Sequence, residues 1–152
     1  MIIGNFFKQI KPEYKKHKFT GLSFDSLKCK KGDVFFAIKG TVIDGNKFIS
    51  HAIQKGARTI ISSQGFEGIK KNVLYIKSSN VRKSLSKVSY TLYKNKPKNI
   101  IAVTGTNGKS SIADFYFQIL KLNKVKVASI GTLGIKKGNY VKSVSNTTID
   151  SI

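Results

Sequence analysis

The residues best suited to chemistry form the segment Gly-Thr-Asn-Gly-Lys-Ser-Ser, which begins at Gly105. Gly105 and Gly108 allow the backbone to approach an anion closely, and the amides of the turn and of a following helix direct partial positive charge toward it. Lys109 adds a full charge, and Ser110 or Ser111 supplies a hydroxyl that a nucleotide-bound Mg²⁺ takes as a ligand. The segment therefore predicts a phosphate-binding loop.

The spacing departs from the general phosphate-loop pattern, G-x-x-x-x-G-K-[ST], because Val103 stands where that pattern has its first glycine. An ordinary strand-to-helix turn is the alternative interpretation. That alternative does not explain why a lysine and two serines follow the second glycine. We therefore interpret the segment as a variant phosphate loop.

The flanking residues supply the context that such a loop needs. The continuous apolar run from Ile100 to Val103 predicts a buried parallel strand before the loop. Behind the loop, apolar residues recur at the spacing of one helical face. These residues are Ile112, Phe115, Tyr116, Ile119 and Leu120.

The first half of the chain alternates short strand patterns with helix patterns. Strands are predicted at 19–24, 34–38, 59–61 and 73–76, where β-branched and aromatic residues gather. One helix is predicted to open at Asp44-Gly45-Asn46 and to close at Gly56, and a second to be capped by Asn80. This pattern predicts a small α/β unit.

The polar, proline-containing stretch 95–99 is the best candidate for a linker. We expect one domain at 1–94 and the start of another at 100–152, with a strand at 125–130 after the loop helix. Two strands and one helix cannot bury a complete sheet, so the second domain is expected to be truncated.

Composition narrows the functional classes. The formal charge of +21 would favour a nucleic-acid partner, but only Arg58 and Arg82 are arginines and the lysines are scattered. The lone Cys29 fits a reducing compartment and reads as a small packed residue. No apolar run suits a signal peptide or membrane span, so we expect a cytoplasmic protein. His17 and His51 are assigned no role.

With these residues laid out, the chain resembles the N-terminal part of the Mur ligases, the ATP-dependent amide ligases of peptidoglycan precursor synthesis. The loop GTNGKS is that family's form of the phosphate motif. In the first half, Phe24-Asp25-Ser26, the stretch 31–40 and Asp44-Gly45-Asn46 resemble the family's UDP-binding domain. Within the family, Gly131-Thr132-Leu133-Gly134 and Asn146-Thr147-Thr148 resemble the ligase that adds the third peptide residue.

The resemblance implies a UDP-binding domain followed by the start of a Rossmann-like domain that binds ATP. It implies a two-step reaction in which a peptide carboxylate becomes an acyl phosphate and a diamino acid, diaminopimelate or lysine, then forms an amide. It places Mg²⁺ at Ser110 and makes Lys109 the catalytic residue. The implied ATP contacts are Gly105, Thr106, Asn107, Gly108, Lys109, Ser110 and Ser111. The implied substrate contacts are Phe24, Ser26, Thr41, Val42, Ile43, Asn146, Thr147 and Thr148.

UDP-MurNAc-L-Ala-D-Glu and a diamino acid are the implied partners of an expected monomer that binds neither nucleic acid nor membrane. By itself the chain is expected to have no ligase activity. The alternatives are a ligase that adds the terminal dipeptide, a folylpolyglutamate synthetase-like enzyme and a non-catalytic nucleotide-binding module.

Overall fold

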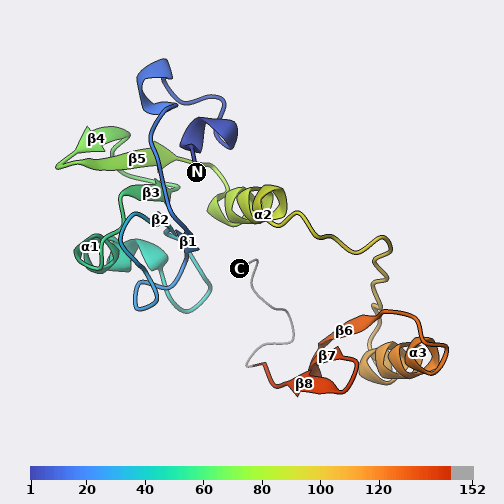
Figure 1. Cartoon of the computed structure of the whole chain (residues 1–152). Helices are drawn as coiled ribbons and strands as arrows, with labels where there is room; N and C mark the ends of the chain where they lie inside the picture. Colours follow the sequence, from blue (N-terminus) through green and yellow to red (C-terminus); the bar gives the residue numbers. More distant parts are fainter. Residues whose placement is uncertain (145–152) are drawn as a thin grey trace. The chain divides into compact units, whose positions relative to one another are not determined.

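A computed structural model describes residues 1–144 of the chain (Figure 1). The chain divides into two compact units, Met1–Lys94 and Asn95–Asp150, the second of which is described up to residue 144.

The first unit is built on a five-stranded sheet within residues 1–94, in the order β1-β2-β3-β5-β4. The first four strands in that order run parallel, and β4 pairs antiparallel with β5 at the edge. Parallel pairing brings the carboxyl ends of four strands to the same edge of the sheet. The strands are β1 (Leu22–Ser23), β2 (Val34–Phe36), β3 (Thr59–Ser62), β4 (Gly68–Lys70) and β5 (Val73–Lys77).

The helices of this unit begin at the caps that the sequence indicates. The Asp44 carboxylate accepts a hydrogen bond from the Asn46 amide at 2.9 Å, and Asn80 accepts one from the Lys83 amide at 2.8 Å. Gly56 ends α1 with a φ of 108°, which favours glycine. The helices are η1 (Ile3–Asn5), η2 (Pro12–Tyr14), η3 (Gly45–Phe48), α1 (Ile49–Gln54) and α2 (Val81–Leu92).

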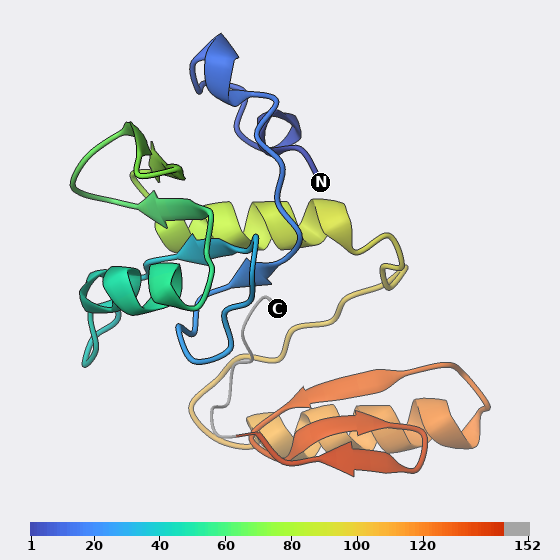
Figure 2. The same cartoon turned by 60° about the vertical axis from the view of Figure 1, so that its left-hand side comes forward.

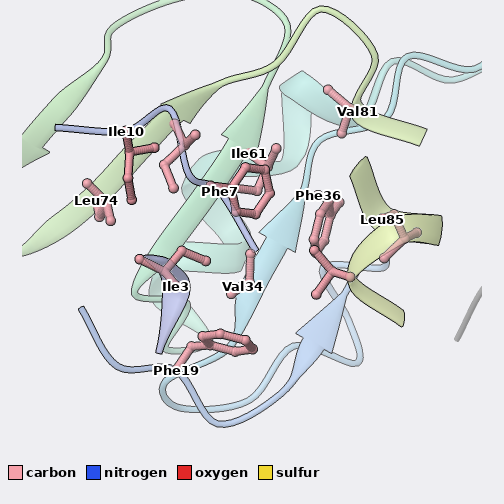
Figure 3. Packing of buried hydrophobic residues seen from close by; sticks show 12 residues of the cluster. Ile3, Phe7, Ile10, Phe19, Val34, Phe36, Ile61, Leu74, Val81 and Leu85 are labelled. Carbon is pink, nitrogen blue, oxygen red and sulfur yellow. The ribbon is translucent and has the colours of Figure 1, made fainter. Parts of the chain in front are cut away.

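The sheet lies between α1 and α2 (Figure 2), and its central strands are buried on both faces. Because side chains alternate along a strand, Val34 and Phe36 join the cluster under α2, whereas Phe35 packs with Ala52 of α1. Figure 3 shows the larger cluster, in which the N-terminal segment covers the same face as α2. Its labelled residues are Ile3, Phe7, Ile10, Phe19, Val34, Phe36, Ile61, Leu74, Val81 and Leu85.

The described part of the second unit, residues 95–144, holds one long helix beside a three-stranded antiparallel sheet. Lys136 of the sheet donates to the Asp114 carboxylate on the helix, and this contact, together with Gln118, holds the pKa of Asp114 below its usual value. The elements are α3 (Lys109–Leu122), β6 (Ala128–Gly131), β7 (Gly134–Lys137) and β8 (Tyr140–Lys142).

The buried parallel strand predicted at Ile100 to Val103 is wrong for this structure. The segment forms no strand, and Ile100 and Ile101 are 83% and 59% exposed. A strand needs a neighbour to pair with, and the described strands β6, β7 and β8 pair only among themselves. The strand predicted at 125–130 forms, but it is shifted to Ala128–Gly131.

The helix behind the loop is confirmed, but the predicted apolar face is not its buried face. Phe117 is the buried residue of α3. Ile112, Phe115, Tyr116 and Ile119 are each at least 45% exposed. A periodic apolar stripe shows where a helix can pack, and within the described unit the sheet packs beside a different set of side chains.

The mixed α/β fold class is confirmed. The four strands predicted in the first half are present, although β1 and β2 are shorter than predicted. Strand β4 was not predicted; it follows an exposed loop, and two of its three residues are exposed. Among residues 1–144, the structure contains no helix with the length and apolar character needed to traverse a bilayer.

Cys29 is buried in the cluster beside α1, as expected for a small packed residue. Burial, together with the charge of Asp33, raises the pKa of its thiol to about 11. The thiol is therefore protonated and unreactive at neutral pH.

The burial of His17 predicts that the stability of the first unit depends on pH. Its Nε2 is buried with no hydrogen-bond partner among the described residues, and burial is the main cause that lowers its pKa. The unfolded chain therefore takes up a proton more readily, so stability present above the ordinary pKa of 6.5 is lost as pH falls through the folded value. We expect the urea midpoint to fall between about pH 7 and about pH 5, and to fall less in His17→Gln. Equal falls in both proteins would contradict this origin.

Candidate functional site

The phosphate loop predicted from sequence is an open turn that leads directly into α3. Gly105 has a φ of 148° and Gly108 a φ of 74°, conformations that favour glycine. A Cβ atom built at Gly108 meets nothing within 4 Å, and one at Gly105 meets only the Asn107 carbonyl oxygen at 3.8 Å. No described atom therefore crowds the Cβ position of either glycine.

The Lys109 side chain folds back over this turn. Its Nζ donates to the carbonyl oxygen of Gly105 and, at 3.0 Å, to that of Thr106. The loop carbonyls thus hold the Lys109 ammonium group close to the turn. A bound phosphate oxygen would replace these neutral carbonyl acceptors with a charged acceptor.

The first turn of α3 has donors to offer an anion. Gly108 is its N-cap and has no side chain with which to satisfy the amides of the first turn. Thr106, Asn107, Ser110 and Ser111 are all exposed beside these amides. Helix α3 begins at Lys109 and has fourteen residues, so its N-terminus carries the partial positive charge of the helix dipole. The backbone amides of α3 and the Lys109 side chain therefore both favour a phosphate here.

The same residues fit a nucleotide-bound Mg²⁺ better than a metal held by protein alone. Among the described residues, no group of three or more His, Cys, Asp or Glu side chains could hold a metal ion. Mg²⁺ usually takes one or two protein ligands and completes its shell with phosphate oxygens and water. The exposed Ser110 hydroxyl, one residue after Lys109, suits that role.

In the first unit, the sequence-predicted contacts lie where the parallel strands end. Phe24 and Ser26 follow β1, and the turn at 41–43 lies beyond the end of β2, the strand that pairs with β1. Ligands of open parallel sheets bind in the crevice outside the carboxyl ends of the strands. The topology thus places both predicted segments at the edge of the sheet that suits a ligand.

The turn after β1 is held by its own side chains. The Ser23 hydroxyl donates to the Asp25 carbonyl at 2.6 Å, and the Asp25 carboxylate accepts from the Leu27 amide at 2.9 Å. Asp25 is therefore a turn-forming acid, and Leu27 is 75% exposed. Ser26 is 6% exposed and its hydroxyl lies 3.0 Å from Nδ1 of His51.

Thr41, Val42 and Ile43 form an exposed turn with a closed base. The Gly40 amide donates to the Ile43 carbonyl at 2.9 Å, and an isolated bridge pairs Lys39 with Asp44. Val42 is 93% exposed, so an apolar side chain is presented to solvent at the tip of a turn. The backbone and side-chain amides of Asn46 lower the pKa of the Asp44 carboxyl below its usual value. The ionised Asp44 carboxylate caps η3 directly after the turn.

Two polar contacts at this edge are absent from the sequence prediction. His51 approaches Ser26, and the Ser62 hydroxyl at the end of β3 donates to the Asn46 side-chain oxygen at 2.7 Å. Ser26 and His51 are 25 positions apart in the sequence, and Asn46 and Ser62 are 16 apart, so no local spacing pattern indicates either contact. The usable signal was that Ser62 directly follows the strand predicted at 59–61, whose carboxyl end meets those of β1 and β2.

The predicted contacts Asn146, Thr147 and Thr148 lie outside the described residues. The structure brings Ser26 together with His51, and it brings Gly105 and Thr106 together with Lys109.

A parallel sheet with a polar carboxyl edge and a glycine-bracketed loop at a helix start are features typical of α/β nucleotide-binding proteins. A family model described as the Mur ligase family, catalytic domain, matches residues 18–101. The chain belongs to the Mur ligase family.

Two relatives and one solved structure that share one protein name are similar to this chain. The chain is 44% identical over 127 residues to a UDP-N-acetylmuramoyl-L-alanyl-D-glutamate--2,6-diaminopimelate ligase of Rickettsia montanensis, covering 84% of this chain and 26% of that protein. It is 41% identical over 135 residues to the ligase of that name from Clostridioides difficile, covering 88% and 28%. A solved structure of a ligase with that name matches 99% of this chain and 31% of its own, with a TM-score of 0.79 and 26% identity.

A more distant match is the MurF ligase from Thermotoga maritima in complex with ADP. It covers 72% of this chain and 24% of its own, with a TM-score of 0.54 and 26% identity. The chain thus spans between about a quarter and a third of the length of the relatives it matches.

Replacing Lys109 tests the loop. We expect Lys109→Ala to weaken binding of a non-hydrolysable ATP analogue with Mg²⁺ by about ten- to a hundredfold, the worth of a charged hydrogen bond. Titration calorimetry measures the affinity, and Lys126→Ala, which removes an exposed lysine of the same unit, should leave it unchanged. Equal affinities for the parent and Lys109→Ala would remove this side chain from the site.

Proposed function

We propose that this chain carries the uridine-nucleotide-binding unit and the ATP phosphate loop of a ligase that adds diaminopimelate to UDP-N-acetylmuramoyl-L-alanyl-D-glutamate. The observation that carries the proposal is the pairing of two features in one chain: the buried Ser26 hydroxyl at the carboxyl edge of the first sheet, and Lys109 folded over an open glycine turn. The relatives' names supply the substrates.

In that reaction the carboxylate of the bound peptide takes the γ-phosphoryl group of ATP and releases ADP, and the amine of diaminopimelate then displaces phosphate to form the amide. Such chemistry depends on position and charge neutralisation more than on a protein nucleophile. In this chain Lys109 and the first amides of α3 would hold the β- and γ-phosphates. Mg²⁺, when bound with the nucleotide, would neutralise phosphate charge, and Ser110 would be its protein ligand.

The first unit would hold the substrate by its nucleotide. Ser26 would bind the uridine diphosphate group, with Phe24 and the turn at 41–43 beside it. Asn146, Thr147 and Thr148 would contact the muramoyl peptide. Binding energy from the nucleotide, remote from the reacting carboxylate, would serve to orient that carboxylate.

The dipeptide-adding alternative has less support. The match to the solved MurF ligase covers 72% of this chain with a TM-score of 0.54, against 99% and 0.79 for the diaminopimelate ligase. Diaminopimelate is favoured over lysine because the relatives in Rickettsia and Clostridioides bear diaminopimelate in their names. A cytoplasmic, monomeric enzyme is part of the same proposal.

Removing one hydroxyl tests the substrate site. We expect Ser26→Ala to weaken binding of UDP-N-acetylmuramic acid about three- to tenfold, because one ordinary hydrogen bond is lost. Calorimetry in the Lys109→Ala background keeps the phosphate loop from contributing. Ser50→Ala, an exposed serine on α1, is the matched control and should bind like the parent. The site is misplaced if Ser26→Ala and Ser50→Ala bind equally well.

A further inference from the structure

His51 is the side chain at the carboxyl edge of the first sheet that the proposed function leaves without a role. It lies on α1, the helix that follows the 41–43 turn through η3, and its Nδ1 is 3.0 Å from the Ser26 hydroxyl. The contact therefore joins two stretches of chain, one after β1 and one after β2, that both belong to the proposed nucleotide site.

The packing of α1 does not need this contact. Ala52 is fully buried, and Ile49 and Ile53 pack against the same cluster, so the apolar side of the helix is already held. His51 is only partly buried, whereas Ser26 is 6% exposed. The partly exposed His51 ring thus contacts the hydroxyl of Ser26, a residue that is almost fully buried.

The direction of this hydrogen bond decides what Ser26 can offer a ligand. A serine hydroxyl has one proton to donate and two lone pairs that accept. If Ser26 donates to His51, no proton remains for an acceptor group of the ligand. If Nδ1–H of His51 donates to Ser26, the hydroxyl proton is free. A diphosphate presents only acceptors, and a uracil ring presents two carbonyl oxygens against a single N–H.

We propose that His51 is a positioning residue for the nucleotide site: its Nδ1–H donates to the Ser26 hydroxyl oxygen, which directs the Ser26 proton toward an acceptor oxygen of the bound uridine diphosphate. This inference rests on the proposed function, because it needs Ser26 to contact the nucleotide. It adds a residue and a hydrogen-bond direction to that site.

Substitutions at His51 test the contact in the full chain. The side-chain nitrogen of asparagine can occupy the place of Nδ1, whereas leucine offers no hydrogen bond. We expect His51→Leu to weaken binding of UDP-N-acetylmuramic acid about three- to tenfold and His51→Asn to stay within about twofold of the parent. Gln54→Leu, an exposed position on the same helix, is the control for helix composition and should bind like the parent.

A double-mutant cycle separates positioning from general destabilisation. His51→Leu should lose its effect on affinity once Ser26 is alanine, because no hydroxyl is left to orient. If His51→Leu fails to fold, the comparison of His51→Asn with the parent and the ring spectra below still decide. An unchanged loss in the Ser26→Ala background would overturn the proposal.

Nitrogen-15 spectra of the histidine ring read the direction of the bond. With UDP-N-acetylmuramic acid bound, Nδ1 of His51 should show the shift of a protonated ring nitrogen, and an unprotonated Nδ1 would overturn the inference. Failures of the two proposals are distinguishable. Binding that depends on Ser26 but not on His51 defeats the inference alone, whereas a parent chain that does not bind UDP-N-acetylmuramic acid defeats both.

Discussion

Parallel pairing of β1, β2, β3 and β5 is the constraint on which the first unit depends. The chain returns from β2 to β3 through α1, which covers one face, and α2 covers the other face, whereas the chain from β3 to β5 returns through the antiparallel edge strand β4. Strand β2 is buried on both of these faces: Val34 and Phe36 pack on the face of α2, and Phe35 packs on the face of α1. Parallel pairing also gathers the carboxyl ends of these strands, and with them the polar residues that follow, at one edge of the sheet.

A short parallel sheet has little area of its own to bury, and the N-terminal segment makes up part of the difference. Ile3, Phe7 and Ile10 come from the first ten residues and pack on the face that α2 covers (Figure 3). In the same unit the ring nitrogen Nε2 of His17 is buried without a partner among the described residues, and burial lowers the pKa of this histidine. At the polar edge, by contrast, Ser26 and Ser62 each find a side-chain partner.

Local features of the sequence predicted most of the first unit because local physics determined them. Asp44 and Asn80 cap helices where short polar side chains precede apolar periodicity, and Gly56 ends a helix where a left-handed residue is needed. The strand expected at Ile100 failed for the opposite reason, since pairing is not local and an apolar run does not specify its neighbour. The stripe on α3 failed likewise: periodicity located a helix but not the surface against which it packs.

The candidate sites divide in the same way. The candidate phosphate loop could be selected from the sequence because its residues are contiguous, from Gly105 to Ser111, and the structure adds that Lys109 turns back onto the loop carbonyls. Ser26 could be selected through a family resemblance. Its partner His51 could not, because the two residues meet only after α1 has packed across the sheet.

The central claim is that the carboxyl edge of the first sheet binds the uridine nucleotide. Amide chemical-shift mapping of the 152-residue chain with UDP-N-acetylmuramic acid tests it most directly. We expect the largest shifts at Ser26, at 41–43 and at His51, with the amides of the β4–β5 hairpin unmoved. Shifts that centre on that hairpin, at the far edge of the sheet from β1, with Ser26 unmoved, would contradict the account.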